Sequence, residues 1–233
     1  NLALYAQNAH ELKQSPKGGN IQGIGLFPEA IEHNPVVYEL STEITWMQDA
    51  PDLQKWITDY ARARYGKLPA GAEQGWKVLL ETVYGSKAGR LPSTESVMCA
   101  RPALTIQKVA ANGDLSRPYS TVRLWDAVDH FLQASNDLKK SDTYRYDLVD
   151  VMRQCLSDLS LPLQKQITEA YLAEDNEKLQ QAGEQFLALI DDFDRLLGTR
   201  STFLLGKWIK EARQWGTTEE EKDLYEWNAR TLV

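Results

Sequence analysis

The sequence predicts a mainly α-helical protein, in which an antiparallel helical bundle follows a short piece of a different domain. Apolar residues recur at helical spacing along most of the chain, and glycine or proline clusters separate these segments. The one good strand candidate, residues 21–27, alternates apolar with small residues and stands alone near the N-terminus. Because a single strand has no place in a helical bundle, we expect it to be the last piece of another domain.

The first third of the chain is predicted to contain two helices that flank this strand. A short helix over residues 2–13 ends at the breaker cluster of residues 15–19, which contains a proline and two glycines. Asn34 suits the N-cap of the second helix and Pro35 suits its first position. Apolar residues between positions 36 and 47 then form its helical stripe.

The middle of the chain is predicted to contain two helices and an irregular stretch. Asp52 suits the start of one helix, and Gly66 lies where a C-terminal glycine belongs. The next helix carries an apolar stripe over residues 76–84 and ends at Gly85. Residues 86–118 contain scattered Ser, Gly, Pro and Asn without a sustained period, which predicts a long irregular connection.

The remaining helices complete the predicted bundle. Their apolar stripes cover residues 124–132, 144–171, 179–197 and 204–212, and a capping-box sequence at residues 217–220 opens the last helix. Pro162 should kink or split its helix, because proline removes a backbone donor and clashes with the preceding turn. Tryptophans at helical spacing are predicted to lie in the core, namely Trp46, Trp56, Trp76, Trp125 and Trp208.

Composition and charge exclude several classes of function. The 233 residues carry a formal net charge of −7 and a pI near 5.1, which argues against general binding of nucleic acid or of anionic membranes. No apolar run approaches the ~18–20 residues of a membrane span. Three histidines and two cysteines, Cys99 and Cys155, give neither a disulfide scaffold nor a recognisable metal site, so no metal or cofactor is expected. Pairing of the two cysteines stays open.

The two ends of the sequence predict a piece of a longer protein. The chain starts at Asn1 without a leader-like segment, and it stops at Val233 inside an apparently helical pattern. We therefore expect a fragment, in which residues 1–45 belong to a preceding domain and residues 46–233 form the helical domain.

The glycine-containing stretch before the second helix holds the best candidate for chemistry. Glu29 directly follows the predicted strand, where barrel enzymes place catalytic groups. Spacing alone also fits an exposed carboxylate that favours a helix N-terminus, and Glu32 and His33 are competing candidates. Gly23-x-Gly25 is not a dinucleotide fingerprint, because the third glycine is missing and no helix starts at once.

A polar cluster interrupts the apolar stripe of the helix over residues 144–171. Arg145 and Asp147 cannot face each other at a spacing of two residues. Each is therefore expected to bond to another helix or to face a cleft, together with Asp150. A buried structural network is the favoured interpretation, and a ligand site is the alternative.

Several separated motifs match one family in the right order over nearly the whole chain. The motifs are Gly23–Ile31, Asn34–Tyr38, Tyr144–Leu148, Phe203–Trp208 and Tyr225–Asn228. On these residues the sequence resembles the C-terminal part of the α-N-acetylglucosaminidases, the glycoside hydrolase family that includes the lysosomal heparan-sulfate enzyme.

The resemblance implies a (β/α) barrel followed by an all-α domain that packs against it. The implied reaction is hydrolysis of terminal α-linked N-acetylglucosamine with retention of configuration. Glu29 falls on the family's catalytic nucleophile, while the acid/base glutamate lies upstream in the family and has no counterpart here. Residues 1–45 are then the last strand and helix of the barrel, and Phe27 and Asn34 are expected to bind substrate.

The resemblance also implies partners and a location. The expected partners are a glycan with terminal α-N-acetylglucosamine and the missing barrel domain, with no cofactor, nucleic acid or membrane. The expected location is periplasmic or extracellular, or lysosomal in a eukaryote. We expect this chain alone to be inactive, because no second carboxylate can be placed opposite Glu29. The alternative is a non-enzymatic all-α interaction domain of a larger protein, which the helical pattern by itself favours.

Overall fold

The chain folds into two compact units, each of which is described by itself. The structure is a computed structural model that describes residues 1–27, 34–85, 93–109 and 113–232. Unit 1 is Asn1–Leu161 and unit 2 is Pro162–Val233. The boundary lies within one long helix, which contributes its first part to unit 1 and its last turns to unit 2.

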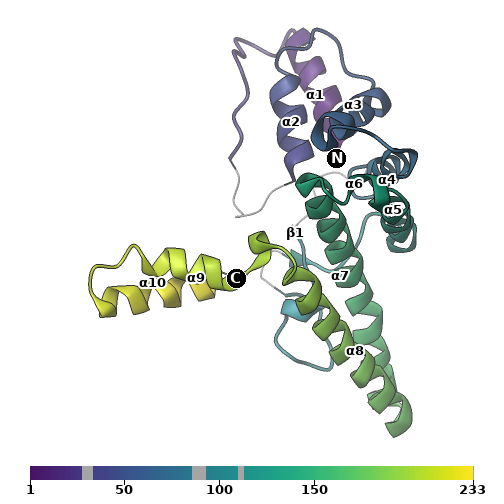
Figure 1. Cartoon of the computed structure of the whole chain (residues 1–233), viewed down its shortest axis with the longest axis vertical. Coiled ribbons are helices and arrows are strands. Elements are labelled where there is room, and N and C mark those ends of the chain that lie inside the picture. The colour runs from purple at the N-terminus through teal and green to yellow at the C-terminus, as the bar shows by residue number, and fades with distance from the viewer. Residues whose placement is uncertain (28–33, 86–92, 110–112, 233) are drawn as a thin grey trace. The chain divides into compact units, whose positions relative to one another are not determined.

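Helices dominate both units, as the sequence predicts (Figure 1). Unit 1 contains α1 (Leu2–Gln14), α2 (Pro35–Glu43), α3 (Leu53–Tyr65), α4 (Ala70–Glu81), α5 (Thr121–Gln133), the short α6 (Ser135–Leu138) and most of α7 (Asp142–Leu172). Unit 2 contains the end of α7, then α8 (Asn176–Leu197), α9 (Leu205–Arg213) and α10 (Glu219–Thr231). Two turns of 3₁₀ helix lie at Val97–Cys99 and Ser201–Phe203.

The predicted strand at residues 21–27 is wrong for this chain. These residues run as an open segment beside α1 and α2 without strand pairing (Figure 1). A parallel strand is defined by the hydrogen bonds to its neighbours, and no described residue supplies them here. The strands that do form, β1 (Ser93–Thr94) and β2 (Gly113–Asp114), are two residues long and pair in parallel within the predicted irregular region.

The core of unit 1 is built around Trp76 on α4. Its ring meets Tyr60 edge-on at 5.1 Å and Phe131 edge-on at 6.3 Å between ring centroids, and it stacks on Tyr84 at 6.4 Å. Tyr144 on α7 closes the far side of the core, and its hydroxyl donates to the Phe131 carbonyl at 2.7 Å. Offset and edge-on aromatic pairs stabilise a core beyond their buried area, so α3, α4, α5 and α7 are fixed together.

Two glycines allow α4 and α5 to approach closely. A Cβ atom at Gly71 would lie 2.5 Å from the His130 carbonyl oxygen, and one at Gly75 would lie 3.0 Å from the Phe131 ring. Real Cβ atoms do not come so near to backbone oxygen. The sequence therefore places glycine where two helix backbones nearly touch, at the cost of some helix propensity.

Several predicted helix ends are confirmed, and the predicted split of a helix at Pro162 is wrong. The Asp52 side chain accepts hydrogen bonds from the first turn of α3, and Gly66 ends that helix with φ +77°. The predicted capping box of α10 forms one residue later than residues 217–220, between Thr218 and Glu221. In contrast, α7 continues as one helix through Pro162. The proline costs one intrahelical hydrogen bond there.

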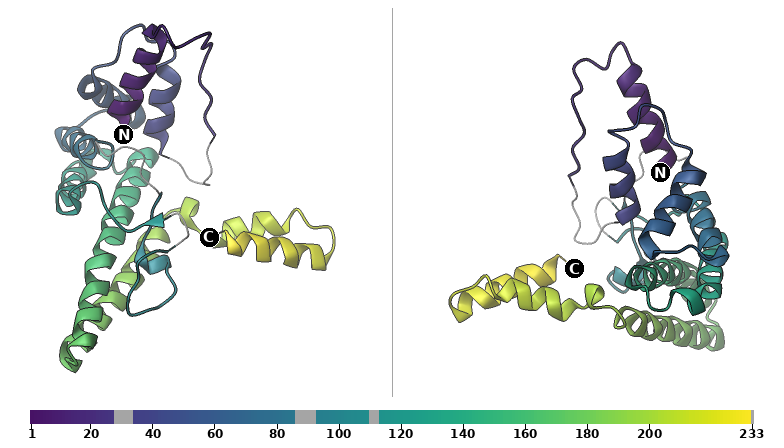
Figure 2. Two further views of the ribbon diagram at one scale, coloured as in Figure 1. Left: turned by 180° about the vertical axis from the view of Figure 1, so that it is seen from behind. Right: turned by 45° about the horizontal axis from the view of Figure 1, so that its top comes forward.

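Unit 2 consists of helices with many exposed apolar side chains. In the α9–α10 hairpin (Figure 2), the Trp208 indole donates to the Ala229 carbonyl at 3.1 Å, and Arg213 pairs with both Asp223 and Glu226. Trp215 is 80% exposed and Trp227 is 63% exposed. The helices of the described residues lack the combination of length and apolar character that a bilayer crossing requires.

Candidate functional site

The segment with the sequence-predicted catalytic group lies at the junction before α2. Glu29, Glu32 and His33 all fall outside the described residues, so their roles stay predictions. Phe27, on one side of them, is 93% exposed. Asn34, on the other side, is the residue immediately before α2.

Asn34 occupies the predicted N-cap position but does not use its side chain as a cap. No side-chain capping hydrogen bond forms at the start of α2. The Asn34 amide oxygen instead accepts a hydrogen bond from the Tyr84 hydroxyl at 2.9 Å. Pro35 has no backbone N–H to donate. The N–H groups of the next residues in the first turn would ordinarily donate to the Asn34 side chain. The side chain is thus diverted from a local bond to a long-range one.

Tyr84 is held from three sides just after the end of α4. Its ring stacks on Trp76, and its backbone carbonyl accepts from the Leu2 N–H at 3.0 Å. Its hydroxyl donates to Asn34. Burial raises the pKa of Tyr84 well above its ordinary value, and the nearby carboxylates of Asp150 and Asp147 raise it further. The hydroxyl therefore stays protonated, and it remains a donor throughout the physiological range.

A small cavity of about 140 Å³ adjoins Asn34 and Tyr84. The polar part of its wall comes from Asn34, Tyr84, Asp150, Arg153 and Gln154, and the apolar part from Leu79, Val83, Leu124 and Val151. Arg153 donates to one Asp150 oxygen from both Nε (2.9 Å) and Nη2 (2.6 Å). The cavity thus offers a carboxylate, an amide and a guanidinium side by side, which is chemistry suited to a ligand with hydroxyl groups.

Asp147, the centre of the predicted polar cluster, belongs to a buried structural network. Arg64 on α3 donates to both of its carboxylate oxygens at 2.7 Å, and the Tyr65 hydroxyl donates at 2.7 Å. The side chains of Arg64 and Asp147 are only 14% and 8% exposed. Burial disfavours the guanidinium charge, but bonding to Asp147 outweighs it and keeps the pKa of Arg64 above its ordinary value. The prediction of a structural network is confirmed for this residue.

Two neighbouring predictions need correction. Arg145 does not reach another helix, because it pairs with Asp142 on its own exposed face at 2.9 Å. Trp46 is not in the core and is 89% exposed. Helix α2 ends at Glu43, three residues before it, so the helical spacing that predicted its burial no longer applies. Asp150, the third polar residue, lines the small cavity, which agrees with the predicted alternative that it faces a cleft.

A second buried ion pair attaches the irregular region to α7. Arg117 Nε lies 2.5 Å from Asp158, with side chains 8% and 2% exposed. Arg117 also donates to the Glu95 carbonyl at 2.9 Å, and the Tyr119 hydroxyl donates to Asp158 at 2.8 Å. Gln154 donates to the same carboxylate at 2.9 Å. Asp147, Gln154 and Asp158 recur along α7 at helical spacing, so one face of this helix organises both networks.

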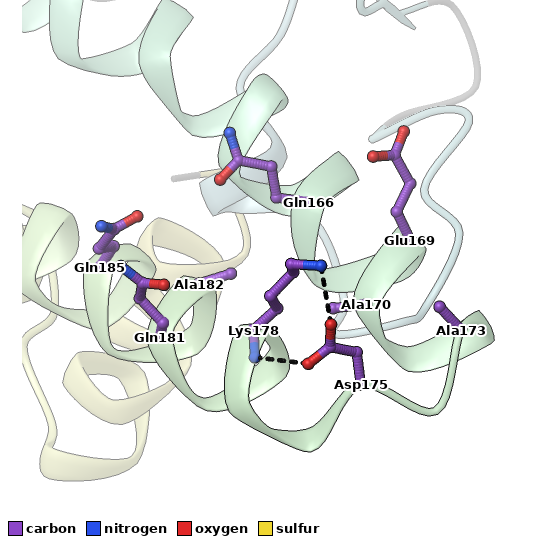
Figure 3. Close-up of a pocket in the computed structure, with 9 residues that line it drawn as sticks. All are labelled: Gln166, Glu169, Ala170, Ala173, Asp175, Lys178, Gln181, Ala182 and Gln185. Carbon is purple, nitrogen blue, oxygen red and sulfur yellow. Dashed lines mark hydrogen bonds and ion pairs between the residues drawn. The ribbon is translucent and has the colours of Figure 1, made fainter.

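The hollow at the α7–α8 turn is a larger but less suitable site (Figure 3). It measures about 470 Å³, and small alanine side chains leave it open. Two of its ionic residues satisfy each other, because Asp175 accepts from both the backbone N–H and the ammonium group of Lys178. Asp175 is also the N-cap of α8. This pair has a sufficient structural explanation, and the hollow lies in unit 2, while Asn34 and Tyr84 lie in unit 1.

Sequence reasoning missed the residues that surround Asn34. Tyr84 fits the apolar stripe of its helix, so its spacing gives no sign of a polar role. Arg153 and Gln154 have no motif around them, and only the packing of α7 brings them to the cavity. Among the described residues, no three His, Cys, Asp or Glu side chains come together as a metal site.

Two family models match almost the entire chain. The alpha-N-acetylglucosaminidase (NAGLU) tim-barrel domain matches residues 1–48, and the alpha-N-acetylglucosaminidase (NAGLU) C-terminal domain matches residues 56–233. The Asn34–Tyr84 hydrogen bond therefore joins a residue of the first match to a residue of the second.

Individual relatives agree with the family models. The chain is 33% identical to the human alpha-N-acetylglucosaminidase over 211 residues, which are 89% of this chain and 28% of that protein. It is similar to the family 89 glycoside hydrolase from Clostridium perfringens in complex with 2-acetamido-1,2-dideoxynojirmycin, with a TM-score of 0.92, 32% identity and coverage of 100% of this chain.

A further structure of the Clostridium perfringens protein carries two glutamate-to-glutamine substitutions and holds its substrate, GlcNAc-α-1,4-galactose, with 31% identity, a TM-score of 0.92 and coverage of 99% of this chain. The chain spans about a quarter of the length of these relatives, 28% of the human protein and 26% of the bacterial one. On the family models, the identity and the fold together, the chain belongs to the α-N-acetylglucosaminidase family of glycoside hydrolases.

Proposed function

We propose that this chain is part of a retaining α-N-acetylglucosaminidase, which removes terminal α-linked N-acetylglucosamine from glycans through a covalent intermediate on Glu29. The observation that carries the proposal is the barrel-domain match over residues 1–48, because it includes the Pro28–Glu29 motif of the predicted nucleophile. The Clostridium perfringens relative that holds GlcNAc-α-1,4-galactose supports the choice of substrate class.

The proposed reaction proceeds in two steps. The Glu29 carboxylate attacks the anomeric carbon and forms an ester bond, while an acid elsewhere in the barrel protonates the leaving oxygen. That second group then removes a proton from water, which attacks the same carbon and frees Glu29. Retaining enzymes hold these two carboxyl groups ~5–5.5 Å apart. The two glutamates replaced in the substrate-bound relative agree in number with such a pair.

The division of the chain follows from the same proposal. Residues 1–45 are assigned to the end of the catalytic barrel, and residues 46–233 to the all-α domain that covers it. The barrel domain and the glycan are the proposed partners, no cofactor is required, and the proposed location is extracellular or periplasmic, or lysosomal in a eukaryote. This chain alone is then inactive, because the acid/base carboxylate belongs to the rest of the barrel.

Phe27 and Asn34 are proposed to contact the substrate. Phe27 presents a large, almost fully exposed aromatic ring two residues before Glu29. A ring of this size is usually covered by another surface or a ligand. The Asn34 oxygen is occupied by Tyr84, which leaves its amide nitrogen as the end that can donate to a sugar hydroxyl.

The proposal is tested by Glu29→Gln in a protein that carries the complete barrel ahead of this chain. Turnover of an aryl α-N-acetylglucosaminide should become undetectable, because glutamine cannot form the glycosyl ester. Glu32→Gln, three residues later, is the matched control and should retain turnover. Sodium azide added to Glu29→Ala should restore release of the aryl group, because azide attacks the anomeric carbon in place of the carboxylate and leaves a glycosyl azide of inverted configuration.

The alternative function, a non-enzymatic all-α interaction domain, makes the opposite prediction. A protein with the complete barrel would then not hydrolyse an aryl α-N-acetylglucosaminide, with or without Glu29→Gln. Full activity of Glu29→Gln, or inactivation by Glu32→Gln instead, would contradict the assignment of the nucleophile.

A further inference from the structure

The Asn34 side chain breaks a local rule in a way that suggests a functional role. Asparagine is among the preferred N-cap residues because its short side chain can satisfy the free N–H groups of the first turn. Asn34 occupies that position, yet its amide oxygen is 2.9 Å from the Tyr84 hydroxyl, and the first turn of α2 has no side-chain cap. Departures from local preference concentrate at functional or strained sites.

Tyr84 is well suited to fix another residue. It follows the last turn of α4, where Trp76 stacks on its ring with the two planes 12° apart. Its carbonyl binds the first helical residue of α1, Leu2. These contacts fix the position of the Tyr84 ring and its hydroxyl oxygen without help from Asn34, so Tyr84 is a well-placed donor and Asn34 is the group that it orients.

Asn34, which accepts the Tyr84 hydrogen bond, is also close in sequence to the proposed nucleophile Glu29. Asn34 follows Glu29 by five residues, and five extended residues span at most ~18 Å. Asn34 belongs to the barrel-domain match and Tyr84 to the helical-domain match. The bond is therefore a point at which the helical-domain match holds Asn34, a residue of the barrel-domain match and a proposed substrate contact.

We propose that Tyr84 is a positioning residue of the active site, which acts by fixing the Asn34 amide, the proposed donor to a sugar hydroxyl. This inference rests on the proposed function and adds a role for the helical domain to it. The effect is on geometry and not on chemistry, since a small displacement of a group that orients the substrate lowers the rate of the reaction.

The test is Tyr84→Phe in a protein with the complete barrel, with kcat and KM for an aryl α-N-acetylglucosaminide measured separately. We expect kcat to fall about 3- to 10-fold, the range for one lost hydrogen bond, with KM changed less than twofold. Asn34→Ala should lower kcat by a similar factor, and the double variant should be no slower than the worse single variant.

Tyr144→Phe is the matched control, because it removes a buried hydroxyl that binds the Phe131 carbonyl and has no contact with Asn34. It should lower the melting temperature and leave kcat unchanged. The inference is overturned if Tyr84→Phe behaves like Tyr144→Phe, or if the losses from Tyr84→Phe and Asn34→Ala multiply. Either result, together with an inactive Glu29→Gln, leaves the proposed function in place, whereas an active Glu29→Gln removes the proposed function itself.

Discussion

The two units use charge in different ways. In unit 1 the ion pairs Arg64–Asp147 and Arg117–Asp158 are long-range and nearly buried, with every side chain at most 14% exposed. In the described part of unit 2, ion pairs such as Lys178–Asp175 and Arg195–Asp192 are local and exposed. A buried pair fixes the packing around it and is costly to break, while an exposed pair contributes little. The two buried pairs of unit 1 therefore fix the packing around them, which the local exposed pairs do not.

The two units also differ in how much apolar surface their helices expose. Unit 1 buries the aromatic residues of its core, with Trp76 3% exposed and Phe131 fully buried, although Phe27 and Trp46 on its surface are exposed. Unit 2 leaves Leu187, Trp215 and Trp227 more than 60% exposed. Since the chain spans about a quarter of the length of its relatives, part of this surface is available for contact with other regions of such a protein.

The largest effect should come from breaking the buried pair of unit 1. Asp147→Ala leaves the Arg64 guanidinium buried without its carboxylate and should destabilise unit 1 by about 3–5 kcal/mol. Urea titration followed by segment-resolved hydrogen exchange measures this loss separately in each unit. Asp192→Ala, which removes the exposed pair with Arg195, is the control and should change stability by less than about 0.5 kcal/mol. Equal effects of the two substitutions would refute the comparison.

A glycine-to-alanine substitution should change stability in opposite directions in the two units. At Gly71 a new Cβ atom would lie 2.5 Å from the His130 carbonyl oxygen, so Gly71→Ala should destabilise the α4–α5 contact by about 1–3 kcal/mol. At Gly183, in α8, the same atom would meet nothing within 4 Å. Gly183→Ala should therefore stabilise unit 2 by up to about 1 kcal/mol through helix propensity. Thermal unfolding of both variants measures these changes. A lower melting temperature for Gly183→Ala would contradict the open space around Gly183 in α8.

The smallest effect concerns pH, and it should be confined to unit 1, because unit 2 contains no cysteine. Cys155 is fully buried, and burial raises the pKa of its thiol to about 12, with the Asp158 charge acting in the same direction. Above pH 9 the unfolded thiol loses its proton while the folded one keeps it. Its contribution to stability is therefore lost as pH rises from about 9 towards 12, by about 1 kcal/mol between pH 9 and 10.

This pH dependence can be measured by urea titration at several pH values. Cys155→Ala should show a flatter decline between pH 9 and 10 than the parent chain. Both cysteines are free thiols, and Cys99 is exposed, so iodoacetamide should modify Cys99 in the native protein and Cys155 only after unfolding. Modification of Cys155 in the folded chain at pH 9 would show that its enclosure opens readily.

Local signals in the sequence predict most of the helices. Asp52 and Gly66 bound α3 as expected, because a cap and a left-handed glycine depend only on neighbouring residues. The prediction fails where distant residues decide. Residues 21–27 have the pattern of a strand but pair with none of the described residues, and α7 continues across Pro162 although proline opposes this locally.

The candidate site shows the same limit. The sequence points to Glu29 through the family motif, and the positions of Phe27 and Asn34 follow from it. It gives no sign of Tyr84, Asp150 and Arg153 as neighbours of Asn34, because these residues are brought together by the packing of α4 and α7 against the start of α2.

The sequence by itself determined the helical class, the ends of most helices and the family, since each of these depends on residue types at fixed spacings along the chain. Only the tertiary structure decided which carboxylates are buried, how closely α4 and α5 approach, and that Asn34 binds Tyr84 instead of capping its own helix. The physical reason is that a side chain with two possible hydrogen-bond partners chooses between them by their positions in space. Those positions are set by the aromatic core around Trp76, which local sequence does not encode.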